Sequence, residues 1–206
     1  MGLVLGITGG IAAGKSTVSR LLAQRGAVVV SADQLARELV APGRAALRRL
    51  VDCFGSAILL SDGQLDRAGL GALVFADADR RRQLEAILHP AIASLSRRRL
   101  RQAARQTPLV VYEAPLLYEV GAEKRVDRVL TVTVDSAVQL QRLQRRDGGT
   151  VEEARRKVAA QMSQAEKARR ADYVIDNSAD LAALQRQVAA LWQRLQAEGL
   201  LVDVRD

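Results

Sequence analysis

Four runs of apolar residues follow one another along the chain with the length and composition of buried strands. They lie at 3–8, 27–31, 109–113 and 129–134, and a shorter run lies at 173–176. The runs are rich in β-branched residues and nearly continuous, which is typical of parallel strands covered on both faces. Because helical patterns separate them, the sequence predicts an α/β fold with a five-stranded parallel sheet between two layers of helices.

The intervening segments carry apolar residues at the three- and four-residue spacing of amphipathic helices. The predicted helices cover 15–24, 34–39, 45–54, 77–105, 137–146, 152–162 and 181–196. Thr150 and Glu153 form a capping-box pattern that predicts the start of the sixth of these. Trp192, in the last helix, is expected to belong to the core or its cover.

The alternation of strands and helices is interrupted at 34–106, where helical patterns alone occur. We interpret this region as a helical substrate-binding insert in a single domain, whose core comprises 1–33, 107–141 and 171–206. The arginine-rich segment 142–170 has little apolar content and contains Gly148–Gly149, a candidate hinge. It is therefore predicted to form a small helical lid.

Glycine and lysine are combined in an unusual way directly after the first predicted strand. Gly9, Gly14, Lys15 and Ser16 satisfy the pattern G-x-x-x-x-G-K-[ST] of the phosphate-binding P-loop. Glycines allow the backbone to wrap closely, so that N–H groups and the following helix end face the phosphates. Lys15 is predicted to reach the β- and γ-phosphates, Ser16 to ligate Mg²⁺, and Thr17 to lie near the α-phosphate.

The nucleotide is expected to be ATP. GTPases normally recognise guanine through an Asn-Lys-x-Asp element, whereas the one asparagine of this chain, Asn177, is followed by Ser178. The predicted ATP-binding residues of the loop are Gly10, Ile11, Ala12, Ala13, Gly14, Lys15, Ser16 and Thr17.

Two carboxylates at predicted strand ends are candidates for the chemistry. Glu113 could support Mg²⁺ through water, or be a strand-end acid with a backbone partner. Asp33 follows the second strand at the sheet edge where ligands bind, and could deprotonate an acceptor hydroxyl or cap the next helix.

Phosphoryl transfer also needs cations beside the transferred group and exclusion of water. Arg142 and Arg146 are four residues apart in a predicted helix and would share one face, whereas Arg145 lies off that face. These two arginines are the candidate cations of the lid.

Composition narrows the possible partners. The 206 residues carry a net charge of +8, which suits nucleic acid, a highly phosphorylated small molecule or a solvated surface. No nucleic-acid module or long apolar run is recognisable.

A lone cysteine, Cys53, cannot form an intrachain disulfide and is expected in the core. We therefore expect a cytoplasmic protein without nucleic-acid or membrane partners, although a nucleic-acid-stimulated ATPase and a nucleotide-binding scaffold without catalysis stay open here.

A longer series of motifs resembles the dephospho-CoA kinase family, P-loop kinases of the nucleoside-monophosphate-kinase-like group. The motifs are TGGIAAGKSTV, SADQLARELVAPG, DGQLDRAGLGALVF, LEAILHP, APLLYE, VDRVLTVTV, QLQRLQRRD and ADYVIDNS, in the family's order and spacing. The resemblance implies transfer of the ATP γ-phosphate to the ribose 3′-hydroxyl of dephospho-CoA, which yields CoA. Mg²⁺ is then the expected cofactor, ATP and dephospho-CoA the partners, and a monomer the expected state.

The same resemblance assigns roles to individual residues. It implies that Asp33 is the base, that Lys15 and Arg142 act with it in catalysis, and that Arg146 and Asn177 contact ATP. His89 alone would be interpreted as a polar residue at a helix end, beside a break or kink imposed by Pro90. The residues that the resemblance places at the CoA moiety are Asp33, Arg67, His89, Pro90, Leu116 and Glu119.

Three departures from the family's usual pattern occur. Ala12-Ala13 stands where many members carry Gly-Ser, and little effect is expected because the variable positions of the loop tolerate small side chains. Ser31 stands where members usually carry an acid two residues before Asp33, so it keeps a hydrogen-bonding group without a charge. Tyr173 replaces a common acid after Asp172 and is expected at the surface.

Overall fold

The computed structural model describes residues 1–75 and 77–201. The chain forms two compact units. The first comprises Met1–Ser31 and Arg99–Asp206, and the second comprises Ala32–Arg98.

The first unit is built on one parallel sheet of five strands, which confirms the predicted fold class. The strands are β1 (Leu3–Gly9), β2 (Val28–Ser31), β3 (Leu109–Glu113), β4 (Arg128–Thr133) and β5 (Tyr173–Asp176), in the order β2-β3-β1-β4-β5. Its helices are α1 (Lys15–Ala23), α6 (Ser136–Asp147), α7 (Val151–Ala159), α8 (Gln164–Arg170) and α9 (Leu181–Ala197). The predicted capping box of Thr150 and Glu153 is present at the start of α7.

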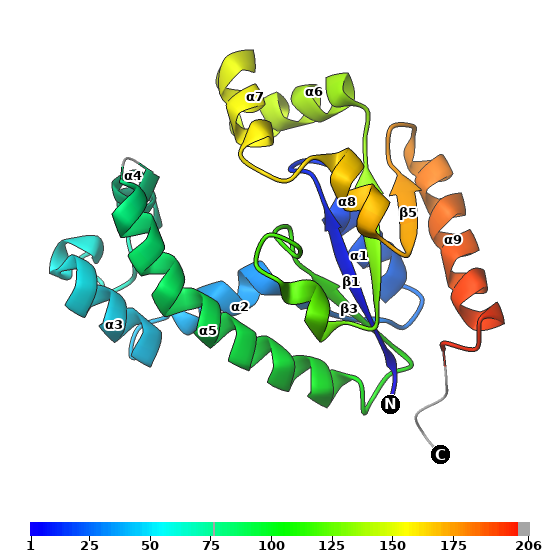
Figure 1. Cartoon of the computed structure of the whole chain (residues 1–206), viewed down its shortest axis with the longest axis horizontal. Helices are drawn as coiled ribbons and strands as arrows, with labels where there is room; N and C mark the ends of the chain where they lie inside the picture. Colours follow the sequence, from blue (N-terminus) through cyan, green and yellow to red (C-terminus); the bar gives the residue numbers. More distant parts are fainter. Residues whose placement is uncertain (76, 202–206) are drawn as a thin grey trace. The chain divides into compact units, whose positions relative to one another are not determined.

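The two faces of the sheet are buried in different ways. Leu5, Ile7 and Leu130 point into an apolar core that includes residues of α1 and α9, and Trp192 packs against this core as expected. Thr8 and Thr131 lie on the opposite face, where both are fully buried. Figure 1 shows α8 in front of the sheet and α1 behind it.

The two buried threonines are satisfied by hydrogen bonds from their hydroxyls. Thr8 donates to the carbonyl of Pro115 at 3.1 Å. Thr131 donates to the carbonyl of Lys167 at 3.1 Å. Buried hydroxyls need such partners, so these bonds fix the loop after β3 and helix α8 to the second face.

The strand register brings several strand ends to one edge. Ile7 and Ser31 are both opposite Glu113, and Gly9 is opposite Val132. Ligands bind at the carboxyl edge of open parallel sheets. The loop that leaves β1 therefore begins at the edge where a ligand site is expected.

The second unit is helical in its described part. It contains α2 (Ala32–Leu39), α3 (Ala45–Phe54), α4 (Arg67–Phe75), the short helix η1 (Ser56–Ile58) and most of α5 (Ala78–Ala103). These helices enclose a small core of their own, formed by Val40, Leu47, Leu50, Ile58 and Leu70.

Two expectations about single residues were wrong. Cys53 is exposed, because the buried stripe of α3 consists of Ala46, Leu47 and Leu50. Tyr173 is buried, because β5 alternates and its first residue faces the α9 side of the sheet. The Tyr173 hydroxyl donates to Glu198, and the ring lies 4.8 Å from the Arg194 guanidinium carbon.

The break expected at Pro90 is also absent, since α5 continues through it. A proline inside a helix removes one backbone hydrogen bond, here to the carbonyl of Ala86. Both residues lie on the exposed side of the helix, where water can solvate that carbonyl.

None of the helices in the described part of the chain is long and apolar enough to cross a membrane.

Replacing Pro90 by Ala should stabilise α5, because it restores the missing N–H and removes the ring. We expect the free energy of unfolding to rise by about 1–3 kcal/mol, measured by chemical and thermal unfolding followed by circular dichroism. Glu85→Ala, at an exposed position of the same helix, is the control and should change stability by less than about 0.5 kcal/mol. A Pro90→Ala protein that unfolds more easily would contradict this account.

Candidate functional site

The loop between β1 and α1 is coiled by residues with positive φ. Gly9 has φ +149°, Ala12 has φ +59° and Gly14 has φ +94°. A Cβ on Gly9 would lie 2.2 Å from the carbonyl oxygen of Val132, and one on Gly14 would lie 2.1 Å from Nδ2 of Asn177. Side chains at these two glycines are therefore excluded both by backbone conformation and by close neighbours.

Lys15 lies inside this coil rather than in solvent. Its ammonium group donates to the carbonyl of Gly9 at 3.1 Å and to that of Gly10 at 2.9 Å, and the residue is 9% exposed. The P-loop lysine is thus held at the concave side of the loop, where an anion can be bound.

The amino end of α1 adds to this positive potential. Gly14 is the N-cap and provides no side-chain hydrogen bond, and the first turn contains no acidic residue. A helix end of this kind attracts anions through its dipole and its N–H groups. Ser16 and Thr17 lie in the same turn.

The oxygen atoms near this helix end fit a magnesium ion bound mainly by phosphate and water. No group of three His, Cys, Asp or Glu residues within 1–75 and 77–201 could hold a metal by itself. Mg²⁺ typically uses one or two protein oxygens and completes its octahedron with phosphate oxygens and water. Ser16 at the start of α1 and Glu113 at the end of β3 supply oxygens of the required kind.

Asn177 supports the loop from the end of β5. Its side-chain amide donates to the carbonyl of Ala13 at 2.8 Å, and its backbone N–H donates to the carbonyl of Thr133 at 2.8 Å. The residue is 7% exposed. Its predicted contact with ATP stays a prediction, but its contact with the phosphate loop is direct.

The two lid arginines have different surroundings on α6. Arg146 pairs with Asp147 at 2.7 Å, and Lys157 of α7 pairs with the same carboxylate at 2.7 Å. These hydrogen bonds hold the pKa of the Asp147 carboxyl well below its ordinary value. Arg142 is half-buried and forms no ion pair with another residue in the described part of the chain.

The loop after β3 is attached to α8 through Glu119. One carboxylate oxygen of Glu119 accepts from the Lys167 ammonium at 2.9 Å and from the backbone N–H of Met162 at 3.1 Å. Lys167 is fully buried and also donates to the carbonyl of Pro115 at 2.7 Å. Leu116, in the same loop, is 44% exposed.

The remaining predicted site residues belong to the second unit. Asp33 is exposed in the first turn of α2. Because this helix begins at Ala32, Asp33 lies inside it and is not its N-cap, so the alternative role as a helix cap is wrong. Arg67 is the first residue of α4. His89 and Pro90 are exposed on α5.

Four residues around the loop were missed by the sequence reasoning. Lys167 contacts Glu119, Gln139 and Gln161 bind the peptide groups of Ile11 in the loop, and Gln164 binds Gln139. Gln139 belongs to the motif QLQRLQRRD, in which only the arginines were given a role, and the other three residues lie outside the motifs. A buried lysine in the short helix α8 had no periodic pattern that would reveal its burial.

A phosphate-binding loop of this geometry, on a parallel sheet of this strand order, places the chain in the class of P-loop kinases. The family model for dephospho-CoA kinase matches residues 3–183. The chain belongs to the dephospho-CoA kinase family, whose members are phosphotransferases that use ATP.

Individual relatives agree with this placement. The chain is 50% identical to the dephospho-CoA kinase of Geobacter sulfurreducens, over 93% of this chain and 98% of the relative. It is 53% identical to that of Geobacter metallireducens, over 93% and 96%. A crystal structure from Thermus thermophilus matches with a TM-score of 0.79 at 34% identity, over 94% of this chain and 98% of the other.

More distant structures share the fold. The dephospho-CoA kinase of Campylobacter jejuni matches with a TM-score of 0.75 at 24% identity, over 97% of this chain and 100% of the other. A shikimate kinase from Bacteroides thetaiotaomicron reaches a TM-score of 0.52 at 15% identity, over 94% and 98%.

Gly14→Ala should nearly abolish nucleotide binding, because the new Cβ would collide with Asn177 and displace the loop. ADP affinity measured by titration calorimetry should fall at least about 100-fold. Gly26→Ala is the matched control: it also has a positive φ, +100°, but its Cβ would meet no atom within 4 Å. It should cost about 1–2 kcal/mol of stability and leave ADP affinity intact. Equal losses of affinity in the two variants would contradict the role of the contact with Asn177.

Lys167→Met should destabilise the first unit, because it leaves the Glu119 carboxylate without its buried cation. We expect a loss of about 3–5 kcal/mol in denaturant unfolding. In the double variant Lys167→Met with Glu119→Gln the unpaired charge is absent, so part of this loss should be recovered. Strictly additive effects would show that the two side chains are not coupled.

Proposed function

We propose that the chain transfers the γ-phosphate of ATP to the ribose 3′-hydroxyl of dephospho-CoA, giving CoA and ADP in the last step of coenzyme A biosynthesis. The observation that carries this proposal is the coiled loop with Lys15 inside it, in a chain about half identical to curated dephospho-CoA kinases. The loop provides the phosphate site, and the family provides the acceptor.

In the proposed reaction the loop binds the triphosphate of ATP. The amino end of α1 faces the phosphates, and the Lys15 ammonium donates to phosphate oxygens near its present carbonyl partners. Asn177 supports the loop, and Arg142 and Arg146 supply positive charge from α6. Of the two arginines, Arg142 is the better candidate for the transferred group, because Arg146 is already paired with Asp147.

Magnesium fits this arrangement as the cofactor. Ser16 would hold it directly and Glu113 through water. When bound, Mg²⁺ would neutralise charge on the phosphates and draw electron density toward the leaving oxygen.

Asp33 is proposed as the general base of the transfer. Its carboxylate takes the proton of the 3′-hydroxyl while the ribose oxygen forms a bond to the γ-phosphorus. The bond from that phosphorus to the β–γ bridging oxygen breaks, and ADP leaves with the electron pair. Arg67, His89, Pro90, Leu116 and Glu119 are proposed to bind the CoA moiety, with Leu116 offering apolar surface and Glu119 fixing its loop.

The monomeric state and the cytoplasmic location expected from the sequence stay predictions.

The proposed function is tested by comparing acceptors in one assay. Purified protein is given ATP and Mg²⁺ with dephospho-CoA, AMP, CMP, shikimate or DNA, and ADP and CoA are quantified by chromatography. Dephospho-CoA should be the acceptor that supports turnover, and Lys15→Ala should lose nearly all of it. ATP turnover that depends on DNA, with no CoA formed, would overturn the proposal.

Asp33→Asn should lower kcat by about 10²–10⁴-fold, because the amide cannot accept the hydroxyl proton. The dissociation constant for ATP should change little, as measured by titration in the absence of acceptor. Asp52→Asn, at another exposed position of the second unit, is the control. Near-normal turnover in Asp33→Asn would remove Asp33 from the role of base.

A further inference from the structure

The peptide groups of Ile11, at the tip of the phosphate loop, are bound by two glutamine side chains. The N–H of Ile11 donates to Oε1 of Gln161 at 3.0 Å. Its carbonyl accepts from Nε2 of Gln139 at 2.8 Å. These contacts span about 130 to 150 positions of the sequence, so they are made by the tertiary fold and not by the loop itself.

The orientation of the Gln139 amide is determined by further hydrogen bonds. Gln139 is 2% exposed, and its Oε1 accepts from Nε2 of Gln164 at 3.0 Å. Gln164 in turn donates to the carbonyl of Val134 at 3.1 Å and accepts from the Val134 N–H at 2.9 Å. The end of β4 therefore fixes Gln164, Gln164 fixes Gln139, and Gln139 fixes the loop tip.

Close packing at the loop also leaves little freedom there. A Cβ on Gly10 would lie 2.6 Å from Nε2 of Gln139. The amide of Gln139 thus occupies the space beside the loop that a side chain would need.

The two glutamines flank the segment that carries the lid arginines. Gln139 lies on α6 one turn before Arg142, and Gln161 follows the end of α7. The adjoining Met162 N–H is bound by Glu119. The segment formed by α6 and α7 is consequently attached to the phosphate loop twice, near the start of α6 and just after the end of α7.

We propose that Gln139 and Gln161 are positioning residues for phosphoryl transfer, which hold the loop tip and set the position of Arg142 relative to the bound triphosphate. This inference rests on the proposed function. Charge stabilisation in the transition state depends on placement within fractions of an ångström, so loss of either amide lowers turnover more than it lowers substrate binding.

The test is a double-mutant cycle with matched variants in the full-length protein. Gln161→Leu and Gln139→Leu keep the approximate side-chain volume and remove the hydrogen bonds. Each should lower kcat by about 10–100-fold, with the KM for dephospho-CoA changed less than about threefold. Gln141→Leu, an exposed glutamine on α6, should retain normal kcat.

The coupling to Arg142 separates positioning from general damage. In an Arg142→Ala background, Gln161→Leu should lower kcat less than about threefold, because the group that it positions is gone. A full additional loss in that background would show that Gln161 does not act through Arg142, and normal kcat in Gln161→Leu would overturn the inference outright.

The direction of the two hydrogen bonds gives a second readout. A carboxylate can still accept from the Ile11 N–H but cannot donate to the Ile11 carbonyl. At saturating ATP, Gln161→Glu should therefore recover much of the turnover lost in Gln161→Leu, whereas Gln139→Glu should recover none relative to Gln139→Leu. The reverse pattern would contradict the proposal.

Folding and function are checked separately. If Gln161→Leu does not fold, as judged by circular dichroism, Gln161→Ala removes the acceptor with less apolar surface and takes its place in the cycle. A wild-type protein that phosphorylates dephospho-CoA, together with glutamine variants of normal kcat, would refute this inference and leave the proposed function standing.

Discussion

The main constraint in the first unit is the tight coil of the main chain between β1 and α1, where three residues have positive φ. This conformation is intrinsically unfavourable for residues with side chains, and it keeps one buried lysine beside two backbone carbonyls. It persists because its neighbours determine it: Asn177 binds the carbonyl of Ala13, and the strand β4 packs against Gly9. An anion site made of backbone needs this external support, because a glycine-rich loop alone would be mobile.

A second set of specific contacts comes from polar groups buried at the second face of the sheet. Thr8, Thr131 and Lys167 are all fully buried there, and each has hydrogen-bond partners on a loop or helix. An apolar face would gain more free energy from burial, but apolar contacts are not directional and would fix the positions of the packed elements less precisely. Satisfied buried polar groups fix one arrangement, because any shift leaves a donor or acceptor unpaired at a cost of about 1–3 kcal/mol each. The loop after β3 and the α7–α8 junction are held in this way.

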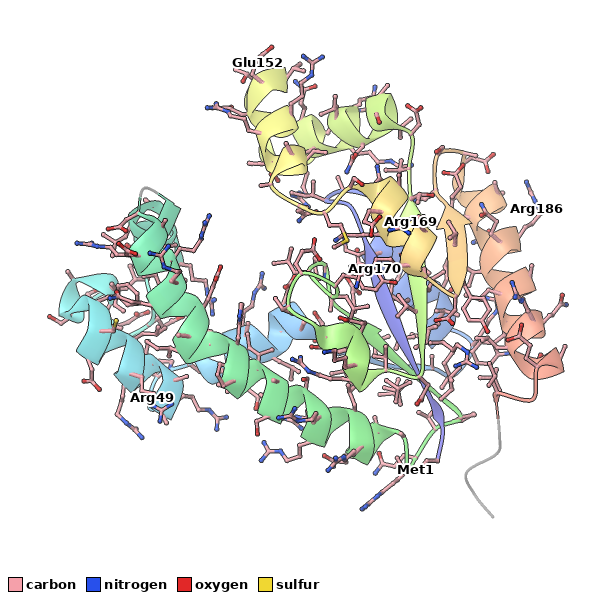
Figure 2. All side chains as sticks on the ribbon, in the orientation of Figure 1. Met1, Arg49, Glu152, Arg169, Arg170 and Arg186 are labelled. Atoms are coloured by element: carbon pink, nitrogen blue, oxygen red, sulfur yellow. The ribbon has the colours of Figure 1, made fainter. Side chains whose placement is uncertain are left out.

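The positive charge of the chain is spread over several surfaces instead of forming the site by itself. Figure 2 shows Arg186 extending outward from α9, and Arg169 and Arg170 on α8. Arg169 pairs with Glu166, and the Arg170 guanidinium lies 4.3 Å from the centre of the Tyr118 ring. Exposed pairs of this kind contribute little to stability. The cation with a defined place in the phosphate loop, Lys15, is instead buried.

Local patterns in the sequence were sufficient to predict most of the elements and the presence of the phosphate loop. Continuous apolar runs predicted all five strands within about two residues at each end, and the spacing of Gly9, Gly14 and Lys15 predicted a phosphate loop after β1. Helix α8 was not found, since seven residues are too few for a periodic signal, and α4 was not found either. The burial of Tyr173, the pairing of Lys167 with Glu119 and the binding of Ile11 by two glutamines appeared only in the folded chain. These contacts join residues far apart in the chain. No local pattern predicts them, because the residues meet only when the sheet brings their elements together.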